Sequence, residues 1–134
     1  MLNSPLQRYQ QASVQTANPG QLILMLYDGA IRFTKLGIEG ITAGKYDMAN
    51  TNLKKAQAII HELTASLNHS YEISKDLAQI YEYWLHRLIE ANLKKEVQPA
   101  VEILNHLADM RESWKQIIKG SAGAGQSPLE ASSV

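Results

Sequence analysis

The sequence predicts an all-α fold, an antiparallel four-helix bundle, and three observations support this. Four segments carry apolar residues at spacings of three and four, the period of one helical face. No segment alternates apolar and polar residues as a half-buried strand would. The connections are short, and short connections place consecutive helices antiparallel. The expected helices run from 18 to 40 or 44, from 46 or 47 to 67, from 74 to between 92 and 95, and from 97 or 98 to 120.

A chain of 134 residues is expected to form one domain with a real core. We expect a short N-terminal arm at 1–17, the bundle at 18–119 and a disordered C-terminal tail at 120–134. The arm is polar with scattered apolar side chains, a pattern too weak for a confident helix. The tail is rich in Gly, Ala and Ser, a composition that cannot bury enough apolar surface to fold.

The first helix has an unusually small polar face. Asn18 is a good N-cap, and Pro19 suits the first turn, where no backbone N–H is needed. On a helical wheel the charged residues fall into one narrow arc, and nearly everything else is apolar or small. We therefore expect the helix to be covered on two sides. The charged arc consists of Asp28, Arg32, Lys35 and Glu39.

Glycines line one side of this helix. Gly29, Gly37 and Gly40 lie on the same face as Leu22 and Leu26. Each glycine inside a helix costs about 1 kcal/mol relative to alanine. Three on one face predict that another helix backbone approaches closely there, although fraying of the helix end would also account for Gly40 alone.

The other three helices have recognisable seams and ends. The second repeats apolar residues at 4-3-4-3-4 spacing, as in coiled-coil packing. Ser74 is the expected N-cap of the third helix, which ends among lysines suited to the negative end of the helix dipole. The fourth has Pro99 in its first turn and ends at Gly120. The second seam consists of Ala49, Leu53, Ala56, Ile60, Leu63 and Leu67.

Composition excludes several classes of function. Lys+Arg and Asp+Glu both number 13, and this balance argues against nucleic acid as the main partner. The chain has no cysteine, which excludes disulfides and thiolate metal sites. No apolar run approaches the roughly 20 residues that span a bilayer, so membrane insertion is not expected. The first five residues lack a secretory signal pattern. We therefore expect a soluble protein of the cytosol.

The histidines do not predict an enzyme or a metal site. Glu82/His86 and Glu102/His106 are four residues apart, whereas di-iron bundles use a Glu-x-x-His spacing of three. No phosphate loop or nucleophile elbow occurs. We expect no enzyme activity, no metal and no cofactor. A signalling bundle that transfers phosphoryl groups through His86 or His106 is the alternative function.

Two apolar flanks remain once the glycine face is assigned to the core. If they lie at the edge of the bundle, they form a groove for a partner's amphipathic helix, with Met as an adaptable contact. The alternative is simply a wider core. The first helix contributes Leu24, Tyr27, Ile31 and Ile38, and the fourth contributes Ile103, Met110, Trp114 and Ile117.

Several runs resemble signature segments of one family. Residues 16–30 read TANPGQLILMLYDGA, with Tyr9 ahead of them, and residues 55–63 read KAQAIIHEL. LIEAN at 88–92 and MRESW at 110–114 follow in the expected order. Together these runs resemble the flagellin export chaperone family, FliS, over about residues 6–119.

The resemblance implies a cytosolic export chaperone. Such proteins bind the C-terminal segment of flagellin, prevent its premature polymerisation and deliver it to the flagellar type III export gate. On this reading the two flanks form the flagellin groove, and the arm around Tyr9 occupies part of it when no client is bound. A weak homodimer of the free protein is left open.

Overall fold

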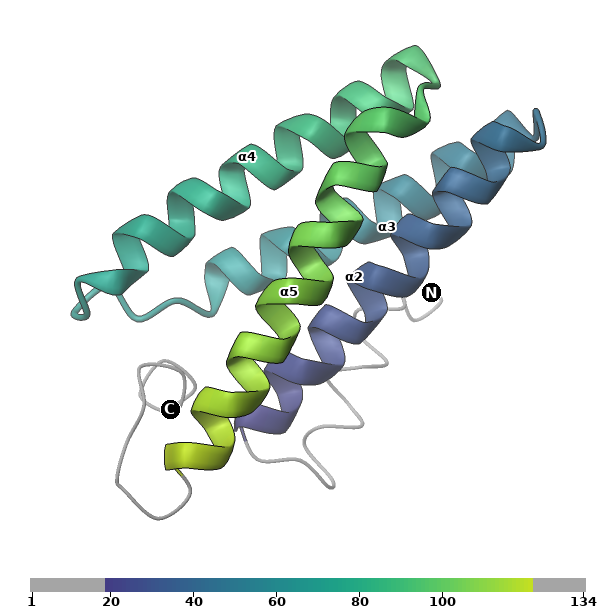
Figure 1. The fold of residues 1–134 in the computed structure, drawn as a ribbon. Helices are drawn as coiled ribbons and strands as arrows, with labels where there is room; N and C mark the ends of the chain where they lie inside the picture. Colours follow the sequence, from purple (N-terminus) through teal and green to yellow (C-terminus); the bar gives the residue numbers. More distant parts are fainter. Residues whose placement is uncertain (1–18, 122–134) are drawn as a thin grey trace, which may run out of the picture.

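The computed structural model describes residues 19–121 as four antiparallel helices (Figure 1). They are α2 (Pro19–Thr42), α3 (Tyr46–Ala65), α4 (Ile73–Lys94) and α5 (Val97–Ser121). The prediction of an all-α four-helix bundle is confirmed, and the helix ends fall close to those expected. The expectations for the arm, the Asn18 cap and the tail beyond residue 121 fall outside the described residues.

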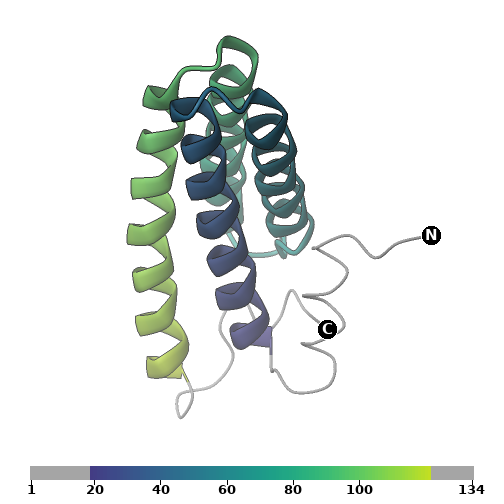
Figure 2. The same ribbon diagram turned by 90° about the vertical axis from the view of Figure 1, so that its right-hand side faces the viewer.

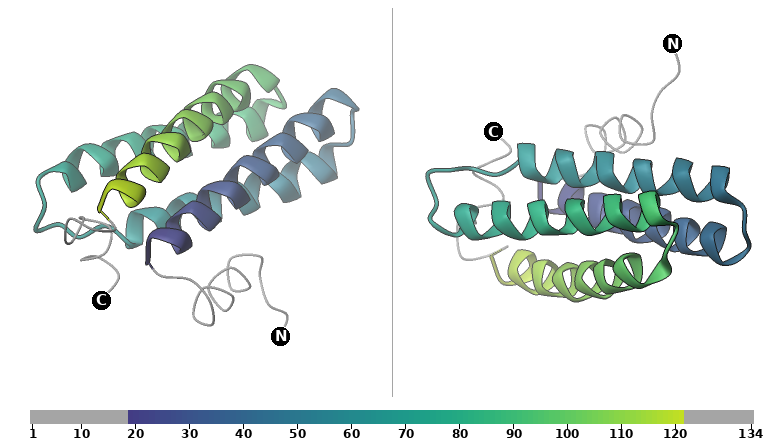
Figure 3. Two further views of the ribbon diagram at one scale, coloured as in Figure 1. Left: turned by 60° about the horizontal axis from the view of Figure 1, so that its bottom comes forward. Right: turned by 90° about the horizontal axis from the view of Figure 1, so that it is seen from above.

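The helices form a four-sided arrangement in which each packs against two neighbours. Helix α2 contacts α3 and α5, and α4 contacts the same two, so α2 and α4 face each other across the core. Helices α4 and α5 meet at their connection and separate toward their other ends (Figures 1 and 3). At that open end α2 and α5 extend beyond α3 and α4 (Figure 2).

The α2–α3 connection is a glycine-terminated helix end. Gly44 adopts a left-handed φ of 70°, which costs glycine little. The amide of Lys45 donates to the carbonyl of Gly40 over 2.8 Å, and the amide of Gly44 donates to Ile41 over 3.1 Å. This pair of bonds is a Schellman motif, which satisfies two carbonyls at the helix end. The motif fixes the sharp reversal that brings α3 back along α2.

The glycines of α2 permit close contact with α3, as the sequence predicts. A Cβ atom added to Gly40 would lie 2.6 Å from the backbone nitrogen of Ala49, and one added to Gly37 would lie 2.6 Å from the Leu53 side chain. Gly29 is also buried. Since α2 continues to Thr42, fraying does not account for Gly40, and that alternative is wrong.

The start of α4 differs from the prediction. Ser74 lies inside the helix, which begins at Ile73 and has Glu72 as its N-cap residue without a side-chain capping bond. The Ser74 hydroxyl instead donates to the carbonyl of Asn68 over 2.6 Å. Ser74 is 1% exposed, so its hydroxyl ties the α3–α4 connection to the helix start rather than capping the helix.

Candidate functional site

A buried aromatic cluster joins α2, α4 and α5 across the core. The hydroxyls of Tyr27 and Tyr81 lie 2.9 Å apart, and the indole N–H of Trp114 donates to the Tyr27 hydroxyl over 3.1 Å. Trp84 packs edge-on against Tyr27, with ring centroids 6.1 Å apart. Burial raises the pKa of both tyrosines above the usual value, so both hydroxyls stay protonated and available as donors.

Three of the predicted groove residues belong to this core rather than to a surface. Tyr27 and Ile103 are fully buried, and Trp114 is 4% exposed. The helical wheel predicts that Tyr27 lies at the edge of the bundle. This prediction is wrong, because the Tyr27 hydroxyl reaches across the core to Tyr81 on α4. In the free protein these residues support the surface from beneath and present little area to a partner.

The other predicted residues retain accessible surface where the structure describes them. Leu24, Ile31 and Ile38 on α2 are half-buried and pack against the core. On α5, Met110 is half-buried and Ile117 is 44% exposed. Tyr9 lies outside the described residues.

Helix α5 separates the two predicted flanks. Its side toward α2 bears Arg111, which forms an ion pair with Asp28, and Ile118, which lies against Gly20. On the helical wheel, Met110 and Ile117 lie on the opposite side of the buried stripe, toward α4. The α2 flank and the accessible part of the α5 flank therefore lie on different sides of α5.

The α5 flank faces a groove between α4 and α5. Two adjoining pockets of about 330 and 350 Å³ share Ile80, Trp84 and His106 in their lining. Ile80 and Trp84 are four residues apart on α4, and Met110 faces them from α5. Ile80 and Met110 are half-buried and supply the accessible apolar surface, whereas Trp84 lies beneath them and is 1% exposed. We call these three residues the apolar floor, and the floor together with its walls the α4–α5 groove. The wall residues are Asp76, Gln79, Tyr83, His106, Asp109 and Ser113.

A polar network closes this groove near the α4–α5 connection. The Tyr83 hydroxyl donates to Glu102 over 2.5 Å, and Arg87 binds the other oxygen of the same carboxylate over 2.7 Å. These hydrogen bonds lower the pKa of Glu102, with Tyr83 the larger cause and Arg87 the next. The network ties α4 to α5 at one end, so the groove opens toward the end where the helices separate.

One histidine completes the wall of the groove. The indole N–H of Trp84 donates to Nδ1 of His106 over 3.3 Å. Because Nδ1 accepts this bond, the ring proton of a neutral His106 lies on Nε2. The bond satisfies the polar edge of the Trp84 ring, which is 1% exposed beneath the groove. Ile80 and Trp84 belong to the helical apolar periodicity of residues 77–88, which does not indicate that they border a groove.

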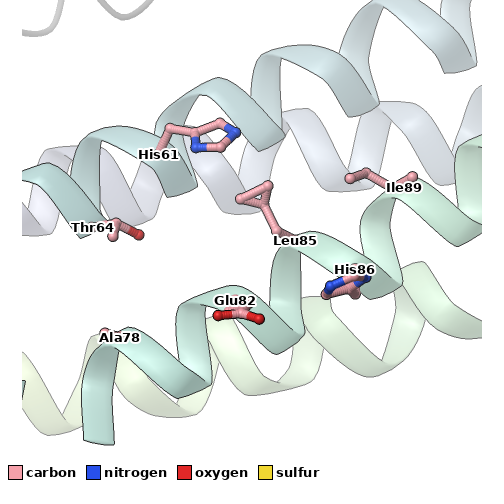
Figure 4. A pocket seen from close by; sticks show the side chains of 7 residues that line it. All are labelled: His61, Thr64, Ala78, Glu82, Leu85, His86 and Ile89. Atoms are coloured by element: carbon pink, nitrogen blue, oxygen red, sulfur yellow. The ribbon is translucent and has the colours of Figure 1, made fainter. Parts of the chain in front are cut away.

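A separate pocket of about 330 Å³ lies between α3 and α4 (Figure 4). Leu85 points from α4 toward α3 near His61, and Glu82 and His86 follow one another along α4 (Figure 4). Within residues 19–121, no group of three or more His, Cys, Asp or Glu side chains is arranged to hold a metal ion. None of the helices over the same range is long and apolar enough to cross a membrane.

Comparison with known proteins identifies the family. Residues 1–121 match the family model described as "Flagellar protein FliS". The chain is 40% identical to the flagellar secretion chaperone FliS of Bacillus subtilis, over 88% of this chain and 89% of that protein. It is 35% identical to the protein of the same name from Salmonella typhimurium, over 85% of this chain and 90% of that protein. The four-helix bundle described here therefore belongs to the FliS family of flagellar proteins.

Proposed function

We propose that this protein is a cytosolic secretion chaperone that binds the C-terminal segment of flagellin in the α4–α5 groove. Binding prevents premature polymerisation of the client and allows its delivery to the flagellar type III export gate. Family membership supports this function over phosphotransfer through a histidine, because relatives are named flagellar secretion chaperones. The single observation that supports the location is the apolar floor of Ile80, Trp84 and Met110.

The groove has the properties that a reversible helix-binding site needs. The accessible part of its floor combines Ile80 with the flexible Met110, and methionine adapts to different apolar side chains. The floor residues recur one turn apart on α4, the spacing at which the apolar stripe of an amphipathic helix can pack. On the wheel, Ile117 lies on the same side of α5 as Met110, and its side chain is 44% exposed. A client segment that covers these side chains removes apolar surface from water and needs no covalent step.

The other residues of the groove predicted from the sequence have two proposed roles, namely a further contact for the client and support of the groove from the core. Leu24, Ile31 and Ile38 are half-buried and offer a further contact for a client that continues around the bundle. On the wheel they lie on the side of α2 that bears Gly20, which contacts α5. The buried residues Tyr27 and Trp114 hold the groove from beneath, since their hydrogen bond joins α2 to α5. The proposed docking of the arm around Tyr9 stays a prediction.

Thermal stabilisation by the flagellin C-terminal segment tests the function. A ligand that binds only the folded state at about a hundred times its Kd adds roughly 2.7 kcal/mol to the free energy of unfolding. We expect a clear rise in Tm with a saturating segment and much less with unrelated amphipathic peptides. An unchanged Tm at saturation would remove the chaperone proposal.

A pair of variants on one helix tests the location. Ile117 and Val101 are both on α5 and are 44% and 39% exposed, but on the wheel only Ile117 lies on the groove side. Ile117→Asp is expected to weaken binding of the flagellin segment by at least tenfold, about 1.4 kcal/mol, because the complex must desolvate the carboxylate. Val101→Asp is expected to bind normally. Equal affinities for the two variants would place the client elsewhere.

A further inference from the structure

Two carboxylates flank the apolar floor of the α4–α5 groove from opposite sides. Asp76 comes from α4 and Asp109 from α5, and both are exposed. Neither forms an ion pair with another residue of the described chain, whereas Asp28, Glu90 and Glu102 each pair with an arginine. Among the described residues that line the two pockets, none is lysine or arginine. The groove thus combines an apolar floor with two carboxylates that form no ion pair within the described residues.

The positions of these charges correspond to the flanks of a docked helix. Asp76 lies one turn before Ile80 on α4, and Asp109 is adjacent to Met110 on α5. When a helix packs its apolar stripe between two others, the residues on each side of that stripe face the neighbouring helices. In coiled coils these flanking positions, called e and g, form the interhelical ion pairs that select a partner. A helix seated on the floor would direct one flank toward Asp76 and the other toward Asp109.

We propose that the α4–α5 groove selects an amphipathic helix that carries basic residues on both flanks of its apolar stripe. This inference rests on the proposed function, because it states the chemistry of the client segment that the groove receives. The apolar floor supplies most of the affinity, and the two aspartates discriminate against acidic helices and fix the docking register. Because the pairs lie at an exposed rim, their contribution falls as salt rises.

Three synthetic 21-residue peptides provide the direct probe. All carry leucine at the a and d positions, and they differ only in having lysine, glutamine or glutamate at e and g. Trp84 lies beneath the groove, so a change in tryptophan fluorescence, to which Trp114 also contributes, follows binding. At low salt we expect the lysine peptide to bind most tightly, the glutamine peptide less tightly and the glutamate peptide most weakly, with about a tenfold difference in Kd between the lysine and glutamate peptides. In 1 M NaCl the three peptides should bind with similar affinity, because the Debye length of about 3 Å screens the charge pairs at the rim.

Two double variants separate selection by the groove from general attraction of a basic peptide. The test variant is Asp76→Asn with Asp109→Asn. The control is Asp47→Asn with Glu39→Gln, which changes the net charge equally at exposed positions outside the groove. The control is closely matched, because Asp47 and Asp76 each occupy the first turn of a helix. We expect the test variant to lose the preference for lysine over glutamate and the control to retain it.

The outcomes distinguish failure of this inference from failure of the proposed function. If the test variant keeps the full preference for lysine, or if the control loses it equally, the inference is overturned. If both double variants bind the flagellin C-terminal segment with wild-type affinity and salt dependence, the inference is also overturned while the chaperone function stands. If the lysine peptide binds selectively but the flagellin segment does not bind at all, the inferred preference of the groove for basic helices is supported, and the proposal that the groove binds flagellin is wrong.

Discussion

Replacing Gly40 with alanine is the substitution whose effect depends most directly on the contact between α2 and α3. A Cβ atom at residue 40 would lie 2.6 Å from the backbone nitrogen of Ala49 and 2.9 Å from its Cα. Both distances are far below ordinary van der Waals contact. The atoms it meets belong to the backbone of α3, so no rotamer change can relieve the clash, and the two helices must move apart.

The expected magnitude follows from two opposing terms. Alanine gains up to about 1 kcal/mol of helix propensity over glycine, and less near a helix end such as this one. Overpacking a tight interface typically costs 1–3 kcal/mol. The clash therefore outweighs the propensity gain, and we expect Gly40→Ala to lose about 1–2 kcal/mol of unfolding free energy. For a domain of this size that loss lowers Tm by roughly 5–10 °C.

Urea denaturation followed by far-UV circular dichroism measures this change. We expect a lower midpoint with an unchanged m-value, which indicates lost stability rather than a changed denatured state. Gly120→Ala is the control, because a Cβ atom there would meet nothing within 4 Å. It should leave stability equal or slightly higher. A Gly40→Ala protein that melts at or above the wild-type temperature would refute the close-packing argument.

Three further substitutions test other parts of the structure. Tyr27→Phe should cost about 1–3 kcal/mol of unfolding free energy, because the buried Trp114 N–H loses its acceptor; urea denaturation measures this. Thr34→Val should raise the urea midpoint by an amount equivalent to about 1 kcal/mol, since the buried Thr34 hydroxyl has no hydrogen-bond partner among the described residues. Hydrogen bonds from Tyr83 and Arg87 hold the pKa of Glu102 in the folded protein below its value in the unfolded chain. The stability that they contribute is present above the unfolded-state pKa and is lost as pH falls through the folded-state pKa. In a plot of Tm against pH, Glu102→Gln should therefore reduce the fall in Tm at acidic pH.

Much of the fold could be predicted because its determinants are local. Heptad-like spacing of apolar residues predicted α3, and Gly44 predicted the turn that ends α2 and reverses the chain direction. The packing role of Gly37 and Gly40 could also be predicted, since glycines inside a helix lower its stability unless a neighbouring chain needs the space. The prediction of Ser74 as an N-cap was wrong. A serine close to a predicted helix start fits the capping pattern, but its actual hydrogen bond to Asn68 depends on the conformation of the α3–α4 connection.

The candidate site was only partly predictable. The wheel places Tyr27 and Ile31 only about 40° apart. Tyr27 alone is fully buried, and its hydroxyl meets that of Tyr81 across the core on α4. Sequence periodicity gives the faces of a single helix but not the angle between helices. The separation of α4 from α5 is a tertiary property, and it is what opens the groove beside Met110. The sequence therefore could not show that the core residue Trp84 lies beneath a groove.

A site-specific fluorescent label tests most directly whether the flagellin segment occupies the α4–α5 groove. The chain has no cysteine, so a single introduced cysteine can carry an environment-sensitive dye. Ser113→Cys places the dye at the groove wall, and Ala58→Cys places it at an exposed position on α3, which does not contact α5. Saturating flagellin C-terminal segment should shift the emission of the Ser113 label to the blue and leave the Ala58 label unchanged. Binding that leaves the Ser113 label unchanged would contradict the proposed location.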